Sequence, residues 1–210
     1  MKHYSKVEKL INKILEVYPA EKLDLKFSSP FELLVAAILA AQAKDEVVNQ
    51  ATEKLFQVYK TPEDFSKLKP EDLEPFISKI NYWYKKAQAI IDASKFLIEN
   101  YGGKVPDSKE ELMKIKGVGS KTANMILGGA FGKPAIIVDT HFDRVSKRLG
   151  LVSKSADRKE VEEEIKKVIP EKDWTRFSFA LIRHGKKICH AKNPECEICP
   201  FSDLCYFFRK

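Results

Sequence analysis

The chain has 210 residues, of which 37 are Lys or Arg and 30 are Asp or Glu, so its formal net charge is +7. A hydrophobic content of 44% is enough for a buried core, and the basic charge favours an anionic partner without defining a site for it. The longest apolar run, Leu33–Ala41, has nine residues, too few to span a bilayer, and the N-terminus lacks the apolar stretch of a signal peptide. We therefore expect a soluble, intracellular protein.

Apolar residues recur at helical spacing from the start of the chain. The first stripe consists of Val7, Leu10, Ile11, Ile14, Leu15 and Tyr18. Ser29-Pro30-Phe31-Glu32 predicts a capping box with proline at the first helical position, and the helix it opens, to about Ala41, is apolar nearly all round. Asp45 is expected to cap the next helix, and further helices are predicted to start at Thr61-Pro62, at Lys69-Pro70, near Tyr84 and at Ser108.

The second half of the chain continues in the same way. A stripe runs from Ala123 to Phe131, and Gly132-Lys133-Pro134 ends that helix and is the best candidate for a domain break. Ala135–Val138 has the composition of a strand, but it has no partner strand in the sequence, so we interpret it as a buried extended connector. Helices are predicted at about 140–149, 156–168 and 171–185. The fold class is therefore all-α.

Two glycines two residues apart, Gly117 and Gly119, mark a tight hairpin between predicted helices. Glycine lets the backbone turn sharply and come close to another molecule. The free amides and the dipole at the start of the next helix favour an anion, and a DNA phosphate fits there. The alternative is a plain corner between two helices, which a lone G-x-G pattern also allows.

Lys121 lies on the first turn of the helix after the hairpin, where the helix dipole is unfavourable for its positive charge. A neutral amine in such a place is a nucleophile. Asp139 follows 18 residues later and can act as an acid, as the N-cap of the helix from Thr140, or as both. Taken singly, each residue is also explained by a structural role, Lys121 as a surface lysine and Asp139 as a cap. The pair indicates covalent chemistry on DNA.

All four cysteines lie near the C-terminus in the spacing C-x6-C-x2-C-x5-C, at Cys189, Cys196, Cys199 and Cys205. Clustered thiols in an intracellular protein usually bind metal. Structural zinc prefers two close pairs, and only Cys196 and Cys199 form one, whereas an iron–sulfur cluster tolerates varied spacing. From the spacing alone zinc and iron–sulfur both remain open, with a pair of disulfides as the third alternative.

These motifs, taken in order, resemble the endonuclease III family of helix-hairpin-helix DNA glycosylases. The resemblance rests on Ser29–Leu34, Ala41–Asp45, Gly117–Ala123, Val138–His141, His184-Gly185 and the cysteine spacing. It implies an all-α fold of two lobes with a DNA cleft between them. A six-helix barrel lobe would span 22–133 and carry the hairpin at about 110–131, and an iron–sulfur lobe would combine 1–21 with 134–210.

The resemblance also implies an activity: a bifunctional DNA glycosylase/AP lyase of base excision repair that removes oxidised pyrimidines. Lys121 would be the nucleophile that forms a Schiff base and cleaves the strand 3′ to the abasic site by β-elimination, and Asp139 the assisting acid. The four cysteines would hold a 4Fe–4S cluster. The partner would be double-stranded DNA with a damaged base or abasic site, bound by a monomer in the cytoplasm, at the nucleoid in a prokaryote. The implied DNA-binding residues are Gln42, Tyr82, Lys116, Gly117, Gly119, His141, Arg144 and Lys192.

Three places depart from the family pattern. Lys116 stands where the family commonly has proline and can add a phosphate contact. The segment Ile80–Tyr84 stands where the family usually has a glycine, an aliphatic or aromatic residue and then a tyrosine. Tyr82 aligns with the intercalating position, and Trp83 is either in the core or stacked on DNA. Glu195 weakens the basic character of the loop that carries Lys192. Two alternatives follow: a glycosylase of the same superfamily for mismatched or other damaged bases, and a non-enzymatic iron–sulfur DNA-binding module. The thymine-mismatch relatives replace the lysine, and a binding module needs no Lys121 and Asp139, so both are disfavoured.

Overall fold

The computed structural model describes residues 2–19 and 22–208, and within these ranges it contains helices and no strands. The all-α prediction is confirmed. The chain divides into two compact units, one of Leu23–Gly132 and one that combines Met1–Lys22 with Lys133–Lys210. None of the described helices has both the length and the hydropathy that crossing a membrane requires.

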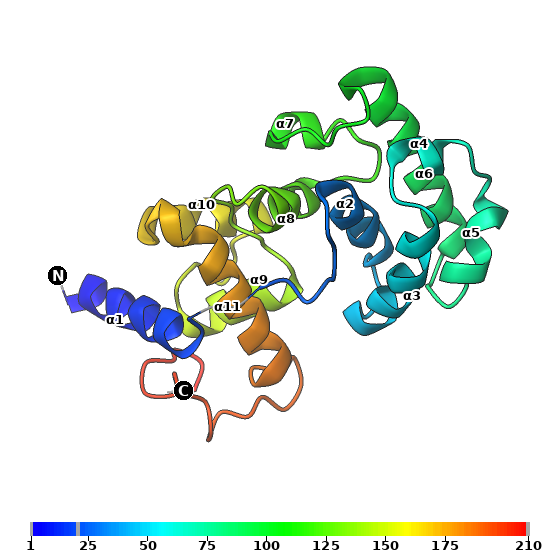
Figure 1. The fold of residues 1–210 in the computed structure, drawn as a ribbon. Coiled ribbons are helices and arrows are strands. Elements are labelled where there is room, and N and C mark those ends of the chain that lie inside the picture. Colours follow the sequence, from blue (N-terminus) through cyan, green and yellow to red (C-terminus); the bar gives the residue numbers. More distant parts are fainter. Residues whose placement is uncertain (1, 20–21, 209–210) are drawn as a thin grey trace. The chain divides into compact units, whose positions relative to one another are not determined.

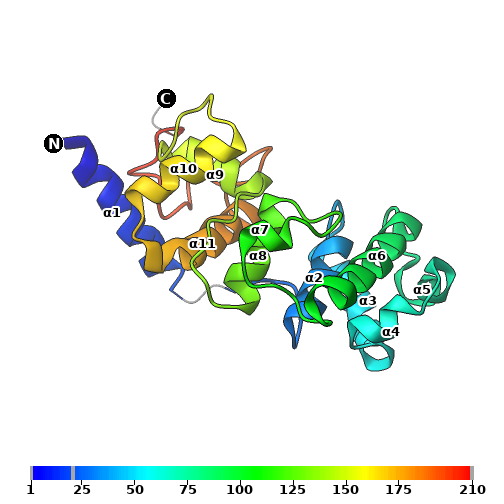
Figure 2. The ribbon, with the colours of Figure 1, turned by 90° about the horizontal axis from the view of Figure 1, so that it is seen from above.

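The unit Leu23–Gly132 is built around one apolar helix, α2 (Pro30–Leu39), in which every residue from Phe31 to Leu39 is buried. Helix α2 packs against α3, α6 and α8, and it lies between α8 and the group of α3 to α6 in both views (Figures 1 and 2). The other helices of the unit are α3 (Asp45–Val58), α4 (Pro62–Ser66), α5 (Pro70–Ile77), α6 (Trp83–Tyr101), α7 (Lys109–Leu112) and α8 (Ser120–Ala130).

The local sequence predicts where the helices of this unit begin, but the caps of α2 and α3 each differ from the prediction. Ser29 caps α2 as predicted, since its hydroxyl accepts from the Glu32 amide at 3.1 Å, but the Glu32 carboxylate accepts from Ser28, one residue earlier than in a capping box. The prediction that Asp45 caps α3 is wrong by one residue. Lys44 is the N-cap and Asp45 the first helical residue, where its charge still complements the helix dipole.

The unit of the two chain ends contains α1 (Lys2–Val17), α9 (Thr140–Leu149), α10 (Arg158–Val168), the short helix η1 (Glu171–Asp173) and α11 (Trp174–Lys187). Helix α11 packs against α9 and α1 (Figure 1). The predicted stripe of α1 enters the same core as the inner faces of α9, α10 and α11. Residues 188–208, which carry the four cysteines and are called the cysteine segment below, follow α11. They cover this core, with Phe201 and Cys205 buried.

The segment Ala135–Val138 is buried and extended without being a strand, as predicted. Two of its backbone amides donate to side chains of α11. The Ala135 amide donates to the Thr175 hydroxyl and the Ile137 amide to the Ser178 hydroxyl, both at 3.0 Å. Buried amides need such partners, so α11 replaces the neighbouring strand that the sequence lacked. The connector leads directly into Asp139 and α9.

Candidate functional site

The predicted hairpin lies between α7 and α8. Ile115 and Val118 are buried and fix the turn, in which the Val118 amide donates to the Ile115 carbonyl at 3.0 Å. Gly117 has φ +90°, a conformation that favours glycine. Gly119 is the N-cap of α8 and supplies no side-chain acceptor to the first turn. An anion is the usual external partner of such a helix start.

Two lysines project from this hairpin. Lys121 is the second residue of α8 and is exposed. The Lys116 side chain is 84% exposed, with its ammonium 3.7 Å from the Asp92 carboxylate of α6. An exposed pair of this kind contributes little stability, so Lys116 can exchange Asp92 for a phosphate at small cost. The hairpin therefore presents two cations and a helix start.

Asp139, in the other unit, is the N-cap of α9. Its Oδ1 accepts from the amides of His141 and Phe142 at 2.8 and 2.7 Å. The prediction of a cap is thus confirmed. One carboxylate oxygen accounts for both bonds, which leaves the acidic role predicted for Asp139 compatible with its structural one.

Gln42 and Tyr82 share an unusual backbone. They are two of three described non-glycine residues with positive φ, at 55° and 59°; the third is Asn193 in the cysteine segment. Both side chains are exposed, that of Tyr82 to 65%. Such conformations cost strain and gather at functional sites. Trp83, the first residue of α6, is half-buried with its ring edge-on to that of Tyr84, so it is neither a core residue nor a freely exposed ring.

Arg144 uses its donors inside its own unit. Its guanidinium donates to the carbonyls of Cys189, Gly185 and Thr140 at 3.1, 2.9 and 3.4 Å, and lies 3.2 Å from His141 Nδ1. Burial lowers the pKa of Arg144. These bonds tie α9 to the end of α11 and to the cysteine segment. They give Arg144 a structural role that the sequence analysis, which placed it on the DNA backbone, did not foresee.

Lys192 is exposed in the loop between Cys189 and Cys196. The Glu195 carboxylate, expected to weaken the basic character of this loop, lies 3.1 Å from His190 Nε2. Glu195 is thus held against His190 within the loop, and Lys192 remains a candidate for a phosphate contact.

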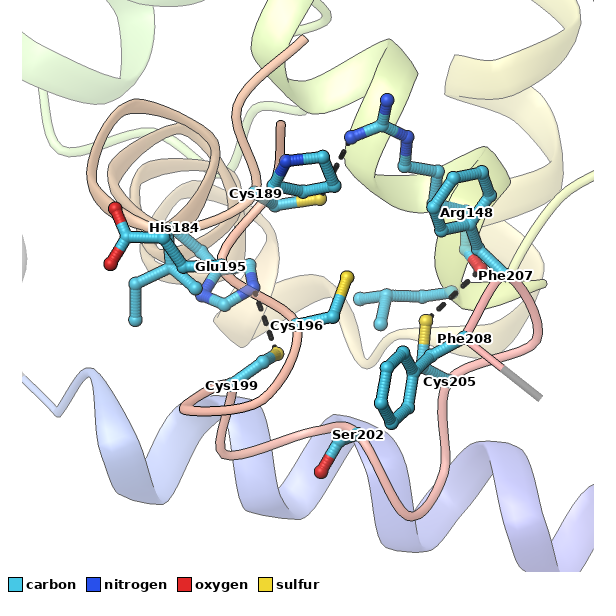
Figure 3. Close-up of a pocket in the computed structure, with 13 residues that line it drawn as sticks. Arg148, His184, Cys189, Glu195, Cys196, Cys199, Ser202, Cys205, Phe207 and Phe208 are labelled. Carbon is cyan, nitrogen blue, oxygen red and sulfur yellow. Dashed lines mark hydrogen bonds between the residues drawn. The ribbon is translucent and has the colours of Figure 1, made fainter. Parts of the chain in front are cut away.

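The four cysteine side chains line one cavity together with Arg148, His184 and Phe207, and their sulfur atoms lie around a common space (Figure 3). The cavity offers about 330 Å³, part of it open to solvent. All four thiols are free, so the disulfide alternative has no support. Within the described residues, no three His, Cys, Asp or Glu side chains converge tightly enough for a single ion.

The chemistry of this donor set fits an iron–sulfur centre. Burial raises the pKa of Cys196 and of Cys199. A cationic iron centre would offset that cost and hold the sulfurs as thiolates, the form in which cysteine binds metal. Cys189, Cys196, Cys199 and Cys205 would hold the cluster, which, when bound, cross-links the segment through its four sulfurs.

Sequence reasoning quoted His184 only as part of the family resemblance and assigned it no role, whereas the structure buries it against the lining of this cavity. Burial lowers the pKa of His184 to about 4, so the ring is neutral. Tyr18 Oη lies 3.0 Å from Nδ1, and Cys199 Sγ lies 3.6 Å from Nε2. With Tyr18 donating to Nδ1, the Nε2 proton points to the Cys199 sulfur. The apolar stripe of α11, which includes Phe177, Ala180 and Leu181, is the signal that could have marked this histidine as buried.

Arg148 was also missed. Its guanidinium donates to the carbonyls of His190 and Ala191 at 2.6 and 3.0 Å and to Cys189 Sγ at 3.4 Å. It also lies 4.7 Å from the centre of the Phe207 ring. Arg148 thus binds both ends of the cysteine segment to α9. Its position one helical turn after Arg144, on the same face of α9, is the only sequence signal for this role.

Comparison with known proteins agrees with this architecture. Residues 35–171 match the HhH-GPD superfamily of base excision DNA repair proteins, and residues 189–205 match the iron–sulfur binding domain of endonuclease III. The chain is 42% identical to Endonuclease III of Thermotoga maritima over 97% of its length and 94% of the relative's, and 43% identical to that of Bacillus subtilis over 98% and 94%.

Solved structures agree as well. A trapped Endonuclease III–DNA covalent intermediate has a TM-score of 0.93 at 39% identity, covering 98% of this chain and 97% of the other. A thermostable thymine-DNA glycosylase has a TM-score of 0.89 at 26% identity, with 98% and 97% covered. The fold and the cysteine site thus define a helix-hairpin-helix base excision repair protein with a 4Fe–4S cluster. The chain belongs to the endonuclease III family, which confirms the resemblance and decides between iron–sulfur and zinc.

We expect Arg148→Met to weaken the cysteine segment. The variant loses hydrogen bonds from a charged donor, which lowers the free energy of unfolding by about 2 kcal/mol. Iron should be retained less well on gel filtration, measured by visible absorbance and iron per protein. The matched control is Lys147→Met, which removes the 2.8 Å pair with Asp143, one turn earlier in α9, leaves the bonds to the cysteine segment in place and should cost about 1 kcal/mol. Equal melting and full iron in both variants would contradict this role.

Proposed function

We propose that the protein is a bifunctional DNA glycosylase/AP lyase that removes oxidised pyrimidines from double-stranded DNA and then cleaves the strand. The observation that carries the proposal is the exposed Lys121 on the first turn of α8, directly after the glycine hairpin, in a chain 42% identical to an Endonuclease III. A covalent intermediate between an Endonuclease III and DNA supports a nucleophile that bonds to the DNA, and Lys121 is our candidate for it. We place the enzyme with the DNA in the cytoplasm, or at the nucleoid in a prokaryote.

The chemistry follows from the two residues. The damaged nucleotide must leave the base stack before its sugar can be reached. The neutral Lys121 amine attacks C1′, the C1′–N bond breaks, and the base leaves with the bonding electron pair. Positive charge develops on the sugar as the base departs, and the Asp139 carboxylate stabilises it. Loss of the amine proton and opening of the sugar ring give a Schiff base between Lys121 and C1′.

Strand cleavage follows from the Schiff base. The C1′=N bond acidifies the C2′ proton, and its removal expels the 3′ phosphate by β-elimination. Hydrolysis then releases Lys121. If water were the nucleophile in its place, the base would leave but the strand would remain intact. Strand cleavage without alkali is therefore the signature of the lysine route.

Other predicted residues of the two units support DNA binding. The α8 start with Gly117 and Gly119 offers amides to a phosphate, and Lys116 adds a cation. Gln42 is suited to fill the space that the flipped base leaves, and Tyr82 to intercalate beside it. His141 and Lys192 are further candidates for contacts to the backbone, while we assign Arg144 to the structural bonds described above.

The test is a panel of duplexes, each with one defined lesion, incubated with the holoenzyme and analysed with and without alkali. We expect a ring-saturated pyrimidine to give a strand break without alkali, and borohydride to trap the protein on an abasic duplex. A thymine mismatch and 8-oxoguanine should react poorly. Breaks that need alkali in every duplex would contradict the lyase, and preferred cleavage at the mismatch would favour the alternative specificity.

A further inference from the structure

Lys86 is a buried cation in the unit Leu23–Gly132. The residue is 7% exposed, and its ammonium donates to the carbonyls of Leu39 at 2.8 Å and Ala41 at 2.6 Å. Leu39 is the last residue of α2, and Ala41 directly precedes Gln42. The ammonium therefore sits at the C-terminal end of α2 and bonds the turn that carries Gln42.

This placement has a physical reason. The last carbonyls of a helix have no amide partner within the helix, and the dipole there attracts a positive charge. Burying an ammonium is nevertheless costly, and burial lowers the pKa of Lys86. An apolar residue would fill the core position at lower cost but would leave the buried Leu39 carbonyl and the partly buried Ala41 carbonyl without their donor. The bonds to the turn are thus the reason for a lysine at this place.

The backbone of Lys86 also forms a hydrogen bond with the segment that carries Tyr82. The Lys86 main-chain amide donates to the Tyr82 carbonyl at 3.1 Å, in the first turn of α6. Its side chain reaches the turn before Gln42, so a single residue links the segments that carry Gln42 and Tyr82. These two residues have φ of 55° and 59°. Both conformations are strained and persist only where surrounding bonds hold them.

We propose that Lys86 is a positioning residue that holds Gln42 and Tyr82 in register, so that both side chains enter the DNA together at the flipped nucleotide. This inference rests on the proposed function, in which Gln42 fills the vacated space and Tyr82 intercalates. Lys86 itself is buried beneath the turns and acts through them. Loss of its ammonium frees the Leu39 and Ala41 carbonyls, and the Gln42 turn relaxes toward less strained conformations.

The loss of this positioning should affect duplex and single-stranded substrates differently. Opening a duplex requires both side chains at the right place, and a shift of about 1 Å can cost about a hundredfold in rate. A single-stranded abasic site needs no opening, because its sugar is already accessible. Lys121, on α8, meets that sugar without help from Gln42 or Tyr82. Impaired positioning should therefore reduce activity on duplexes and spare activity on single strands.

The experiment compares Lys86→Met with Lys85→Met, which removes the exposed neighbouring lysine, and with Lys86→Arg, which keeps a buried donor and charge. We expect Lys86→Met to lower excision from a lesion duplex by about tenfold or more, through kcat rather than KM, because positioning acts after binding. Borohydride trapping on a single-stranded abasic oligonucleotide should stay within about twofold, since the amine chemistry is intact. Lys85→Met should behave as wild type, and Lys86→Arg should recover part of the loss.

A second readout does not require catalysis. A duplex with a tetrahydrofuran abasic analogue opposite 2-aminopurine brightens when the opposite base is unstacked. Wild-type protein should raise this fluorescence, and Lys86→Met should bind the duplex while losing most of the rise. If Lys86→Met does not fold, Lys86→Gln, whose amide still donates, takes its place in both assays with the same expectation at smaller size.

Two results would overturn the inference: an unchanged fluorescence rise in the variant, or equal losses on duplex and single-stranded substrates. If the wild-type protein traps neither substrate, the proposed function fails. The fluorescence comparison still decides the role of Lys86 in opening DNA, so the two failures are distinguishable.

Discussion

Lys121→Ala is expected to abolish the borohydride-trapped adduct on an abasic duplex. In the proposed mechanism the exposed amine on the first turn of α8 forms the bond to C1′ that borohydride makes permanent, and alanine has no group that can replace it. Strand cleavage without alkali should fall by at least about a thousandfold, the scale on which loss of a covalent nucleophile acts. Base release by water attack persists at a low rate. The measurement is gel quantification of adduct and of cleaved strand.

The matched control for this result is Lys116→Ala, the other exposed lysine of the hairpin. A phosphate contact is worth roughly one unit in the salt dependence of binding, so this variant should bind DNA more weakly at higher salt and still form the adduct at saturating protein. The substitution at Lys121 should do the reverse, with binding kept and the adduct lost. An adduct of wild-type yield in Lys121→Ala would remove Lys121 from its role.

The parts of the fold that were predictable are those that short sequence determines. Thr61 caps α4 through a reciprocal box with Asp64, and all the chemistry of that cap lies within four neighbouring residues. Asp45 shows the limit of this reasoning. Both a cap and a first helical position suit an aspartate, and only the backbone of Lys44 distinguishes them.

The residues of the candidate site that belong to short sequence motifs were predictable, and those placed by tertiary contacts were not. The spacing of residues in the sequence identifies the hairpin, Asp139 and the cysteines. Lys86, His184 and Arg148 do not, because a polar residue in a helix is exposed or buried according to what packs on it. A sequence signal existed for Lys86: it shares the helical stripe of Ile90 and Leu97, both buried in α6. A cation within an apolar stripe is a candidate for a buried functional bond.

Asp139→Asn is expected to separate the two roles of this residue. As the cap of α9, Asp139 accepts two amides through Oδ1 alone, and the asparagine amide oxygen can accept the same two, because Asn and Asp cap helices about equally well. The melting temperature should therefore change little. The negative charge is lost, and base release from a lesion duplex should fall by about a hundred- to a thousandfold, as when one preorganised electrostatic group is removed from a transition state.

Asp139→Ala provides the contrast, since it removes both the charge and the cap. It should lose base release to the same extent and in addition about 1 kcal/mol of stability. Binding to an uncleavable abasic duplex should persist in Asp139→Asn, measured by fluorescence anisotropy beside single-turnover excision. A parallel fall in binding and excision would mean that the cap at the start of α9 is the whole contribution of Asp139. A charge that acts only as the base departs leaves binding intact, because free enzyme and bound ground state do not yet carry the positive sugar that it stabilises.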